Sequence, residues 1–82
     1  MKLFVVWPTY LDRYHAEFTS ANSHCEAAER WSTKRVEGRD PPPDEGDSWD
    51  LFVAMLPDGE VKRITATYEE VHTLAFVAKE RV

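Results

Sequence analysis

The sequence has very little cysteine: Cys25 is the only one among 82 residues. A single thiol excludes an intramolecular disulfide, so the chain has to fold on its hydrophobic core without a covalent cross-link. A lone cysteine is also typical of proteins from a reducing compartment. We therefore expect a cytoplasmic protein.

Long apolar runs are also absent. After Met1 and Lys2, only five apolar residues precede Pro8, which is too short for a leader-peptide core or a membrane span. Glycine is scarce, and the three glycines stand apart in the sequence, so no glycine-rich phosphate loop is predicted. These absences argue against a membrane protein and against a nucleotide-binding fold.

Basic residues are few, with 10 Lys and Arg against 15 Asp and Glu and a net charge of −5. Direct binding to nucleic acid or to anionic lipid depends on clustered Lys and Arg, so neither is expected. The chain is nevertheless 43% hydrophobic and 12% aromatic, which is ordinary for a folded protein. We expect residues 1–82 to form a single domain.

A complete set of helix signals lies between Ser23 and Gly38. Ser23 is a suitable N-cap, Glu26 three residues later can complete a capping box, and Gly38 can close the C-terminal end. At 100° per residue the small and apolar side chains gather on one side of this helix. That side consists of His24, Cys25, Ala27, Ala28, Trp31 and Val36. Small residues around one large ring predict close packing on a sheet.

Two strands are predicted before the helix. The apolar run Lys2–Trp7, which stops at Pro8, is typical of a central strand buried on both faces. From Tyr14 to Thr19 apolar and polar residues alternate, which predicts a half-exposed strand. Its dry face is expected to carry Tyr14, Ala16 and Phe18.

A hairpin is predicted after the helix, because Pro57-Asp58-Gly59-Glu60 separates two apolar segments. A two-residue turn at Asp58-Gly59 pairs Val53 with Ile64, Leu51 with Ala66 and Trp49 with Tyr68, and leaves one face apolar. A three-residue loop with a glycine bulge sets Val53 against Arg63 instead. We favour the first register.

The last stretch, residues 69–82, fits either a strand or a helix that begins near Thr67 or Glu69. Its β-branched and aromatic residues between Val71 and Val77 favour the strand. The predicted fold is therefore α+β: a mostly antiparallel sheet of four to five strands in the order β-β-α-β-β-β, with the helix packed on one face.

Catalytic and metal sites are not predicted. Cys25 near the helix N-terminus could be an activated thiol, but His24 points about 100° away from it and no motif surrounds the pair. The three histidines and Cys25 match no zinc spacing. The close carboxylate pairs, Glu69 with Glu70 and Asp47 with Asp50, lack the facing geometry of hydrolases. We therefore expect no cofactor, no metal and no enzymatic activity.

The segment from Glu37 to Asp50 carries the whole excess of negative charge. It holds six acids against the single base Arg39, and the remainder of the chain is neutral. Pro41-Pro42-Pro43 stiffens this segment as a spacer. Such a surface is attracted to a groove lined by Lys and Arg, and a neighbouring tryptophan is the kind of anchor that interfaces favour. The expected partner-binding residues are Glu37, Asp40, Asp44, Glu45, Asp47, Trp49 and Asp50.

In size and charge, and in the segment Ser23–Glu29 between strands, the chain resembles the small acidic accessory proteins of phages and prophages. Some of these are anti-CRISPR inhibitors that occupy the nucleic-acid-binding surfaces of defence complexes. No functional residue carries over from this resemblance. It implies a non-enzymatic protein that docks on a basic protein surface.

Two alternatives remain open at this point. The protein could be a structural homo-oligomer that pairs through an exposed strand edge, with the last strand as the expected edge. It could also be a thiol-dependent enzyme that uses Cys25. The sequence is compatible with a monomer or a homodimer.

Overall fold

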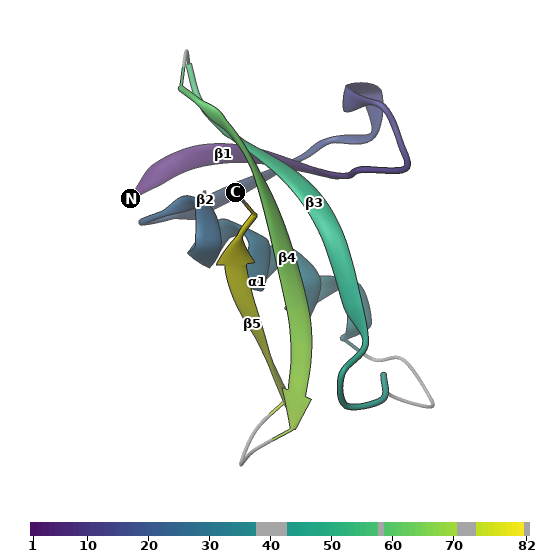
Figure 1. Ribbon diagram of the computed structural model, residues 1–82. Coiled ribbons are helices and arrows are strands. Elements are labelled where there is room, and N and C mark those ends of the chain that lie inside the picture. Colours follow the sequence, from purple (N-terminus) through teal and green to yellow (C-terminus); the bar gives the residue numbers. More distant parts are fainter. Residues whose placement is uncertain (38–42, 58, 71–73, 82) are drawn as a thin grey trace.

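The computed structural model describes residues 1–37, 43–57, 59–70 and 74–81. These residues form one α-helix, a short 3-10 helix and a five-stranded antiparallel sheet with the strand order β2-β1-β3-β4-β5 (Figure 1). The strands are β1 (Lys2–Pro8), β2 (Glu17–Ala21), β3 (Ser48–Met55), β4 (Val61–Glu70) and β5 (Leu74–Glu80), and the helices are η1 (Arg13–His15) and α1 (His24–Val36). The predicted α+β class and element order are confirmed.

β1 is the central element of the N-terminal half, as predicted. It pairs with β2 on one side and with β3 on the other. Phe4 and Val6 face the helix, while Val5 and Trp7 lie on the opposite face, and all four are buried. An apolar run without alternation is the expected pattern for a strand whose side chains are buried on both faces.

α1 begins where the sequence predicts. The Ser23 hydroxyl accepts a hydrogen bond from the Glu26 N–H at 3.1 Å, which satisfies one free donor of the first turn. The Glu26 carboxylate does not reach back to Ser23 but pairs with Arg30 one turn later, at 2.9 Å. The predicted capping box is therefore half formed. The predicted closing residue, Gly38, lies outside the described residues.

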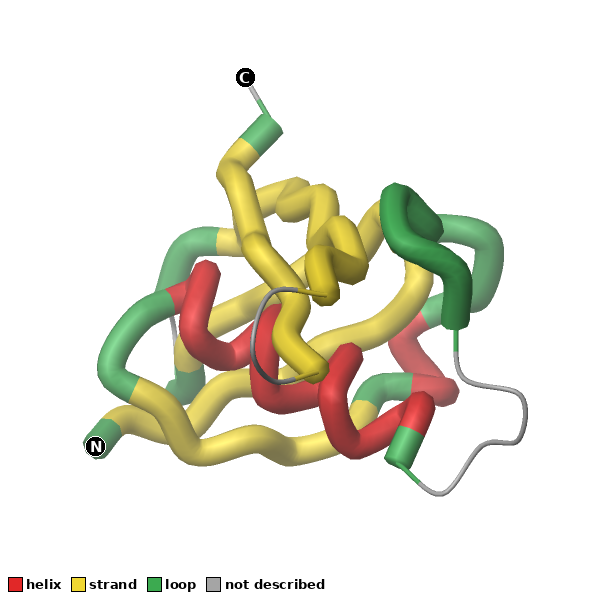
Figure 2. The backbone as a smooth tube through the Cα atoms, turned by 90° about the horizontal axis from the view of Figure 1, so that it is seen from below, coloured by secondary structure: helices red, strands yellow, loops and turns green. Residues whose placement is uncertain are grey.

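The helix packs into a curved sheet. Ala27 and Ala28 are fully buried and Trp31 is 4% exposed. Because the alanines lack long side chains, the strands approach the helix closely. Seen from below in Figure 2, strands lie on two sides of the helix, and α1 contacts all five strands.

The prediction for the second strand is wrong in its limits and in its dry face. β2 covers Glu17–Ala21, and the preceding Arg13–His15 forms η1, in which the Asp12 carboxylate caps the Tyr14 N–H. Tyr14 and Phe18 are 95% and 71% exposed. The buried face of β2 is the opposite one, which ends in Ala21, because α1 covers only that side of the sheet.

The predicted hairpin exists, but its register is shifted by two residues. Val53 lies opposite Lys62, Leu51 opposite Ile64 and Trp49 opposite Ala66. The connection is longer than two residues, because pairing stops at Ala54 and Val61 and the Gly59 N–H donates to the carbonyl of Met55 at 2.7 Å. A shift of two keeps every side chain on its predicted face, so the core remains apolar.

The prediction of a strand at the C-terminal end is confirmed. β5 pairs with β4 from Glu70 opposite Leu74 to Ile64 opposite Glu80. Phe76 is buried against Tyr68, with ring centroids 5.4 Å apart. The topology thus places β2 and β5 at the two edges of the sheet. None of the helices among the described residues is long and apolar enough to cross a membrane.

The helix covers one face of the sheet, and we call the other the open face. A row of apolar residues crosses four strands on the open face, since the register sets Phe18 beside Val5, Val5 beside Ala54 and Ala54 beside Val61. Val5 and Ala54 are buried in this row, whereas Phe18 and Val61 at its ends are exposed.

Removing an aromatic ring should destabilise the protein more on the helix-covered face of the sheet than on the open face. We expect Trp31→Ala to reduce the free energy of unfolding by about 3–5 kcal/mol, because it leaves a cavity in the core. Phe18→Ala should change it by about 0.5 kcal/mol or less, since the ring is mostly solvated. Urea unfolding followed by circular dichroism measures both. Similar losses for the two variants would contradict the assignment of the faces.

Candidate binding surfaces

The acidic residues that precede β3 form a turn that is attached to β4. The Gly46 N–H donates to the Tyr68 carbonyl at 2.9 Å, and the Tyr68 N–H donates to the Asp47 carbonyl at 2.7 Å. Gly46 has a φ of +92°, a conformation that residues with a Cβ rarely adopt. These bonds fix the turn on the end of the β3-β4 pair.

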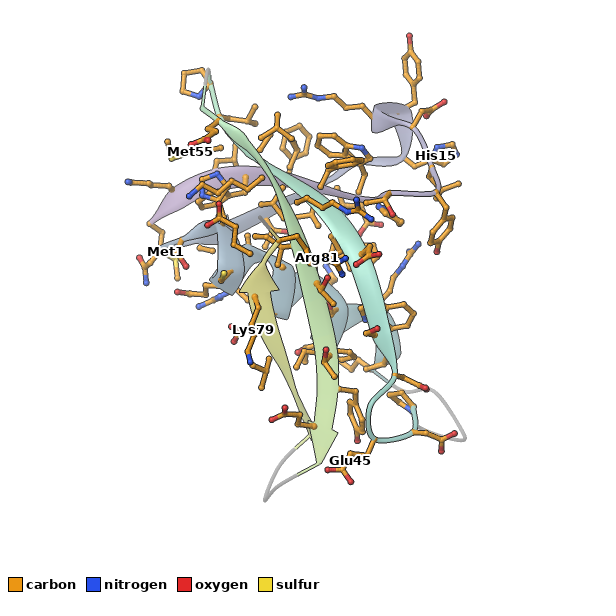
Figure 3. All side chains as sticks on the ribbon, in the orientation of Figure 1. Met1, His15, Glu45, Met55, Lys79 and Arg81 are labelled. Atoms are coloured by element: carbon orange, nitrogen blue, oxygen red, sulfur yellow. The ribbon has the colours of Figure 1, made fainter. Side chains whose placement is uncertain are left out.

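Within the turn, Asp44 and Asp47 bind each other. The Asp47 carboxylate accepts the Asp44 N–H at 3.0 Å, and the Asp47 N–H donates to the Asp44 carbonyl at 3.1 Å. We call Asp44–Asp47 the acidic turn. Its three carboxylates are exposed, and no ion pair to them occurs among residues 1–37, 43–57, 59–70 and 74–81. In Figure 3, Glu45 projects at the lower end of the molecule.

The other predicted binding residues are placed differently. Glu37 is exposed at the C-cap of α1, and Asp40 lies outside the described residues. Asp50 lies on the open face, where its carboxylate accepts from the Thr65 hydroxyl at 2.7 Å and is approached by Arg63 at 3.4 Å and by Arg81 at 3.5 Å. The structure therefore groups Asp44, Glu45 and Asp47 but separates Asp50 from them.

The hydrogen bonds and ion pairs around Asp50 favour its ionised form. The hydrogen bond from the Thr65 hydroxyl, helped by the guanidinium groups of Arg63 and Arg81, lowers the pKa of the Asp50 carboxyl, and partial burial opposes that shift. The carboxylate is thus neutralised by the protein's own arginines. Asp50 holds β3, β4 and the end of β5 together and does not present a free charge.

Trp49 is likewise turned toward the interior. It packs against the main core, and its ring lies 6.0 Å from that of Phe76. Its indole Nε1 is buried without a hydrogen-bond partner in the described part of the chain. Trp49 is thus partly buried and packs on the core beside the acidic turn.

A groove of about 940 Å³ runs between β2 and the C-terminal half of α1. We call it the β2 groove. One wall consists of β2 residues from Glu17 to Ser20, preceded by Ala16, and the other consists of helix residues. The helix contributes three cations and one aromatic ring, namely Arg30, Trp31, Lys34 and Arg35.

Charges in the β2 groove are only partly paired. Arg35 lies 4.9 Å from the centre of the Trp31 ring, a cation–π contact, and 3.8 Å from the Glu17 carboxylate. Arg30 is bound to Glu26, outside the groove. Lys34 is exposed, and no ion pair to it occurs within the described ranges. The groove therefore carries an excess of positive charge in a protein whose net charge is negative.

The Cys25 thiol has the opposite of an activated environment. Burial raises its pKa, and the nearby carboxylates of Glu29 and Glu80 raise it further. His24 turns away from the thiol, since its Nε2 is 3.0 Å from the Glu60 carbonyl and its ring packs edge-on against Phe4. The two residues form no nucleophile and base pair.

Metal-binding groups do not converge in the described part of the chain: no three His, Cys, Asp or Glu side chains there could hold an ion. His15 pairs with Asp12 on the surface, at 3.1 Å. His72 lies outside the described residues. The site-bearing surfaces are therefore the acidic turn, the β2 groove and the open face.

Sequence reasoning missed two of these surfaces. The β2 groove depends on which helix side chains lie beside the edge strand. The only available clue in the sequence was the grouping of Arg30, Lys34 and Arg35 in the second half of the predicted helix. The arginine pair around Asp50 depends on the hairpin register. In the correct register Asp50 faces Thr65, and a polar residue opposite an acid on an open face was the available clue.

Slow thiol chemistry is the expected behaviour of Cys25. Because its pKa is raised, the thiol stays protonated at neutral pH, and iodoacetamide should alkylate it more slowly than free cysteine at pH 7. The rate should rise only above the ordinary titration range of a thiol. Mass spectrometry of the alkylated protein measures both, with the urea-unfolded protein as control. Faster alkylation in the folded state would contradict the assigned environment.

Asp50 is expected to make folding sensitive to acid. Its folded-state pKa lies below its unfolded value, so its stabilising effect is complete above about pH 4 and declines as the pH falls toward the lowered pKa. Asp50→Asn should therefore lose less stability than the wild type between about pH 4 and pH 2. Urea unfolding across this range measures the difference. As a control, Glu45→Gln removes one negative charge from an acid that has no ion pair among the described residues.

Comparison with known proteins leaves the function to be argued from these surfaces. No family model, no curated protein and no solved structure matches this chain.

Proposed function

We propose that the protein is a non-enzymatic binding protein that docks its acidic turn on a basic surface of another protein. The observation that carries this proposal is the acidic turn itself. Three exposed carboxylates without an ion pair among the described residues are held by backbone hydrogen bonds to β4. Charges that are both free and fixed in position lose little freedom on binding.

The rest of the chain has no net charge that would oppose the field of the turn. The excess negative charge of the protein lies within Glu37–Asp50, and the remainder is neutral. Because Asp50 is neutralised internally by Arg63 and Arg81, the free charge is concentrated at the turn. A concentrated field speeds the encounter with a surface of opposite sign.

Basic grooves of this kind are typical of proteins that handle nucleic acid, since they have to neutralise phosphates with Lys and Arg. A protein that occupies such a groove competes with the nucleic acid and inhibits the complex. The resemblance to phage accessory proteins supports a defence complex as the target. The setting that we propose is therefore cytoplasmic.

A second candidate is a homo-oligomer that pairs through a sheet edge. The topology favours it by leaving β2 and β5 at the edges. The exposed apolar side chains at Leu3, Phe18 and Val61 add surface that a second copy would cover.

Neutralising the acidic turn should slow association. We expect Asp44→Asn, Glu45→Gln and Asp47→Asn together to lower the association rate constant severalfold at low salt and to flatten its dependence on ionic strength. Asn at position 47 keeps an oxygen that can accept the Asp44 N–H. The measurement is surface plasmon resonance against the partner captured from cells of the source, at two or more salt concentrations.

A matched control separates the local field from net charge. Glu29→Gln, Glu60→Gln and Glu80→Gln remove the same charge away from the acidic turn and should leave the association rate close to that of the wild type. If affinity were indifferent both to salt and to the turn variant, the docking proposal would be wrong.

Light scattering coupled to size exclusion tests the second candidate. The mass of one chain at all concentrations from micromolar to millimolar would disfavour the homo-oligomer. A mass that rises with concentration, and that falls back in Phe18→Glu, would favour the homo-oligomer.

A further inference from the structure

We infer a second binding site, the β2 groove, which takes an extended acidic segment of a partner protein as an added strand beside β2. This site is separate from the acidic turn, and its ligand has the opposite charge to the surface proposed above. The inference combines three features: an edge strand, a groove beside it and an excess of cations above it.

The first feature is the edge of β2. β2 pairs with β1 on one side and ends the sheet on the other. In an antiparallel strand alternate residues direct their N–H and C=O groups away from the paired neighbour. No backbone bond to the outer edge of β2 is formed by the described residues. An edge of this kind binds an extended peptide through main-chain hydrogen bonds.

The second feature is the space beside that edge. The groove of about 940 Å³ is lined by the β2 residues and by side chains from the C-terminal half of α1. A strand of five residues is about 17 Å long, which matches the length of Glu17–Ala21. Trp31, which is 4% exposed and packed in the core, lines the groove, so part of the groove wall is held in place by the core.

The third feature is charge. Arg30, Lys34 and Arg35 line the helix side of the groove, against Glu17 on the strand side. The exposed ammonium of Lys34 has no ion pair in the described ranges. A carboxylate on the added strand, opposite Thr19, would lie beneath these cations. Charge complementarity therefore selects an acidic segment.

The pleat of β2 adds a second requirement. Thr19 faces the helix, whereas Phe18 lies on the open face and is 71% exposed. Side chains of the added strand alternate in the same way. An apolar side chain opposite Phe18 would extend the apolar row of the open face across one more strand. The ligand is thus an extended segment in which acidic and apolar residues alternate.

The protein's own acidic segment does not meet this requirement. Asp44–Asp47 is folded into a turn whose backbone is bonded to Tyr68, and the preceding Pro41-Pro42-Pro43 lacks the N–H donors of a strand. The edge strands of a second copy, β2 (EFTSA) and β5 (LAFVAKE), do not alternate acidic and apolar residues either. The proposed ligand is therefore a segment of a different protein, and pairing between two copies is an outcome that the test separates.

The test uses a synthetic probe, a nine-residue peptide that alternates valine and glutamate, with blocked ends. Titration of the ¹⁵N-labelled protein should produce saturable shifts in β2 and in the second half of α1. The outward-facing amides of β2 should exchange severalfold more slowly at saturation, as expected for new main-chain bonds. A peptide with glutamine in place of glutamate should bind severalfold more weakly, and a peptide with separate valine and glutamate blocks should not protect β2.

Variants of the protein locate the charge. Arg30→Gln with Lys34→Gln should weaken binding of the probe by about threefold to tenfold, the range expected for two exposed ion pairs. The matched control, Lys2→Gln with Lys79→Gln, removes the same charge outside the groove and should bind within twofold of the wild type. Neutralising the acidic turn should not weaken binding of the probe. Failure of the β2 groove as a binding site can therefore be distinguished from failure of the proposed docking function.

Each of the following results would overturn the inference. One is the absence of saturable chemical-shift changes at millimolar probe, and another is an equal loss of probe affinity in the groove variant and the control variant. A third is a set of shift changes confined to the open face around Val5 and Ala54. The fourth is equally tight binding of a nine-residue oligothymidylate to the same residues. The last result would identify the groove as a nucleic-acid site. Self-association of the protein in place of probe binding would equally exclude a foreign strand.

Discussion

The fold depends on one packing constraint, the close approach of α1 to a curved sheet. Ala27 and Ala28 are fully buried where the strands pass the helix, and Trp31 fills the remaining space. The core cluster on this side draws on all five strands and the helix, so it provides most of the apolar burial available to an 82-residue chain. A longer side chain at either alanine would push the helix away from the sheet. The groove between β2 and the C-terminal half of α1 lies beside this contact, and Trp31 belongs to both.

The distribution of charge follows from the same arrangement. One helix cannot cover both faces of five strands, so the open face carries the apolar row across β2, β1, β3 and β4 as well as the polar cluster around Asp50. Asp50 and the two arginines are used there to join strands. The cations of α1 remain above the edge of β2, and the acids of the turn remain at the far end of the β3-β4 pair. The exposed ammonium of Lys34 and the carboxylates of the acidic turn, which have no ion pair in the described ranges, thus lie in separate parts of the molecule.

The sequence predicted what depends on local order. The Ser23 cap and the faces of the helix at Ala27, Ala28 and Trp31 follow from short-range rules, as does the alternation of β3 and β4. The predicted hairpin register was wrong by two residues, because pairing ends with Ala54 opposite Val61 and the connection covers residues 55–60. No local signal in the sequence fixes the length of this connection. The predicted dry face of β2 was wrong. Phe18 does alternate with its polar neighbours, but it points to the open face, where no second layer covers it. Burial on an edge strand depends on distant elements, which periodicity does not describe.

Tyr68 connects the interior to the acidic turn. Its ring is buried against Phe76, while its backbone N–H and C=O hold Asp47 and Gly46. Loosening of the strand end would therefore release the turn and spread its charges over many conformations. In that case the association rate with the partner would depend on how often the end of β4 frays. Replacing Phe76 by a smaller residue would then alter recognition although every carboxylate of the turn is kept.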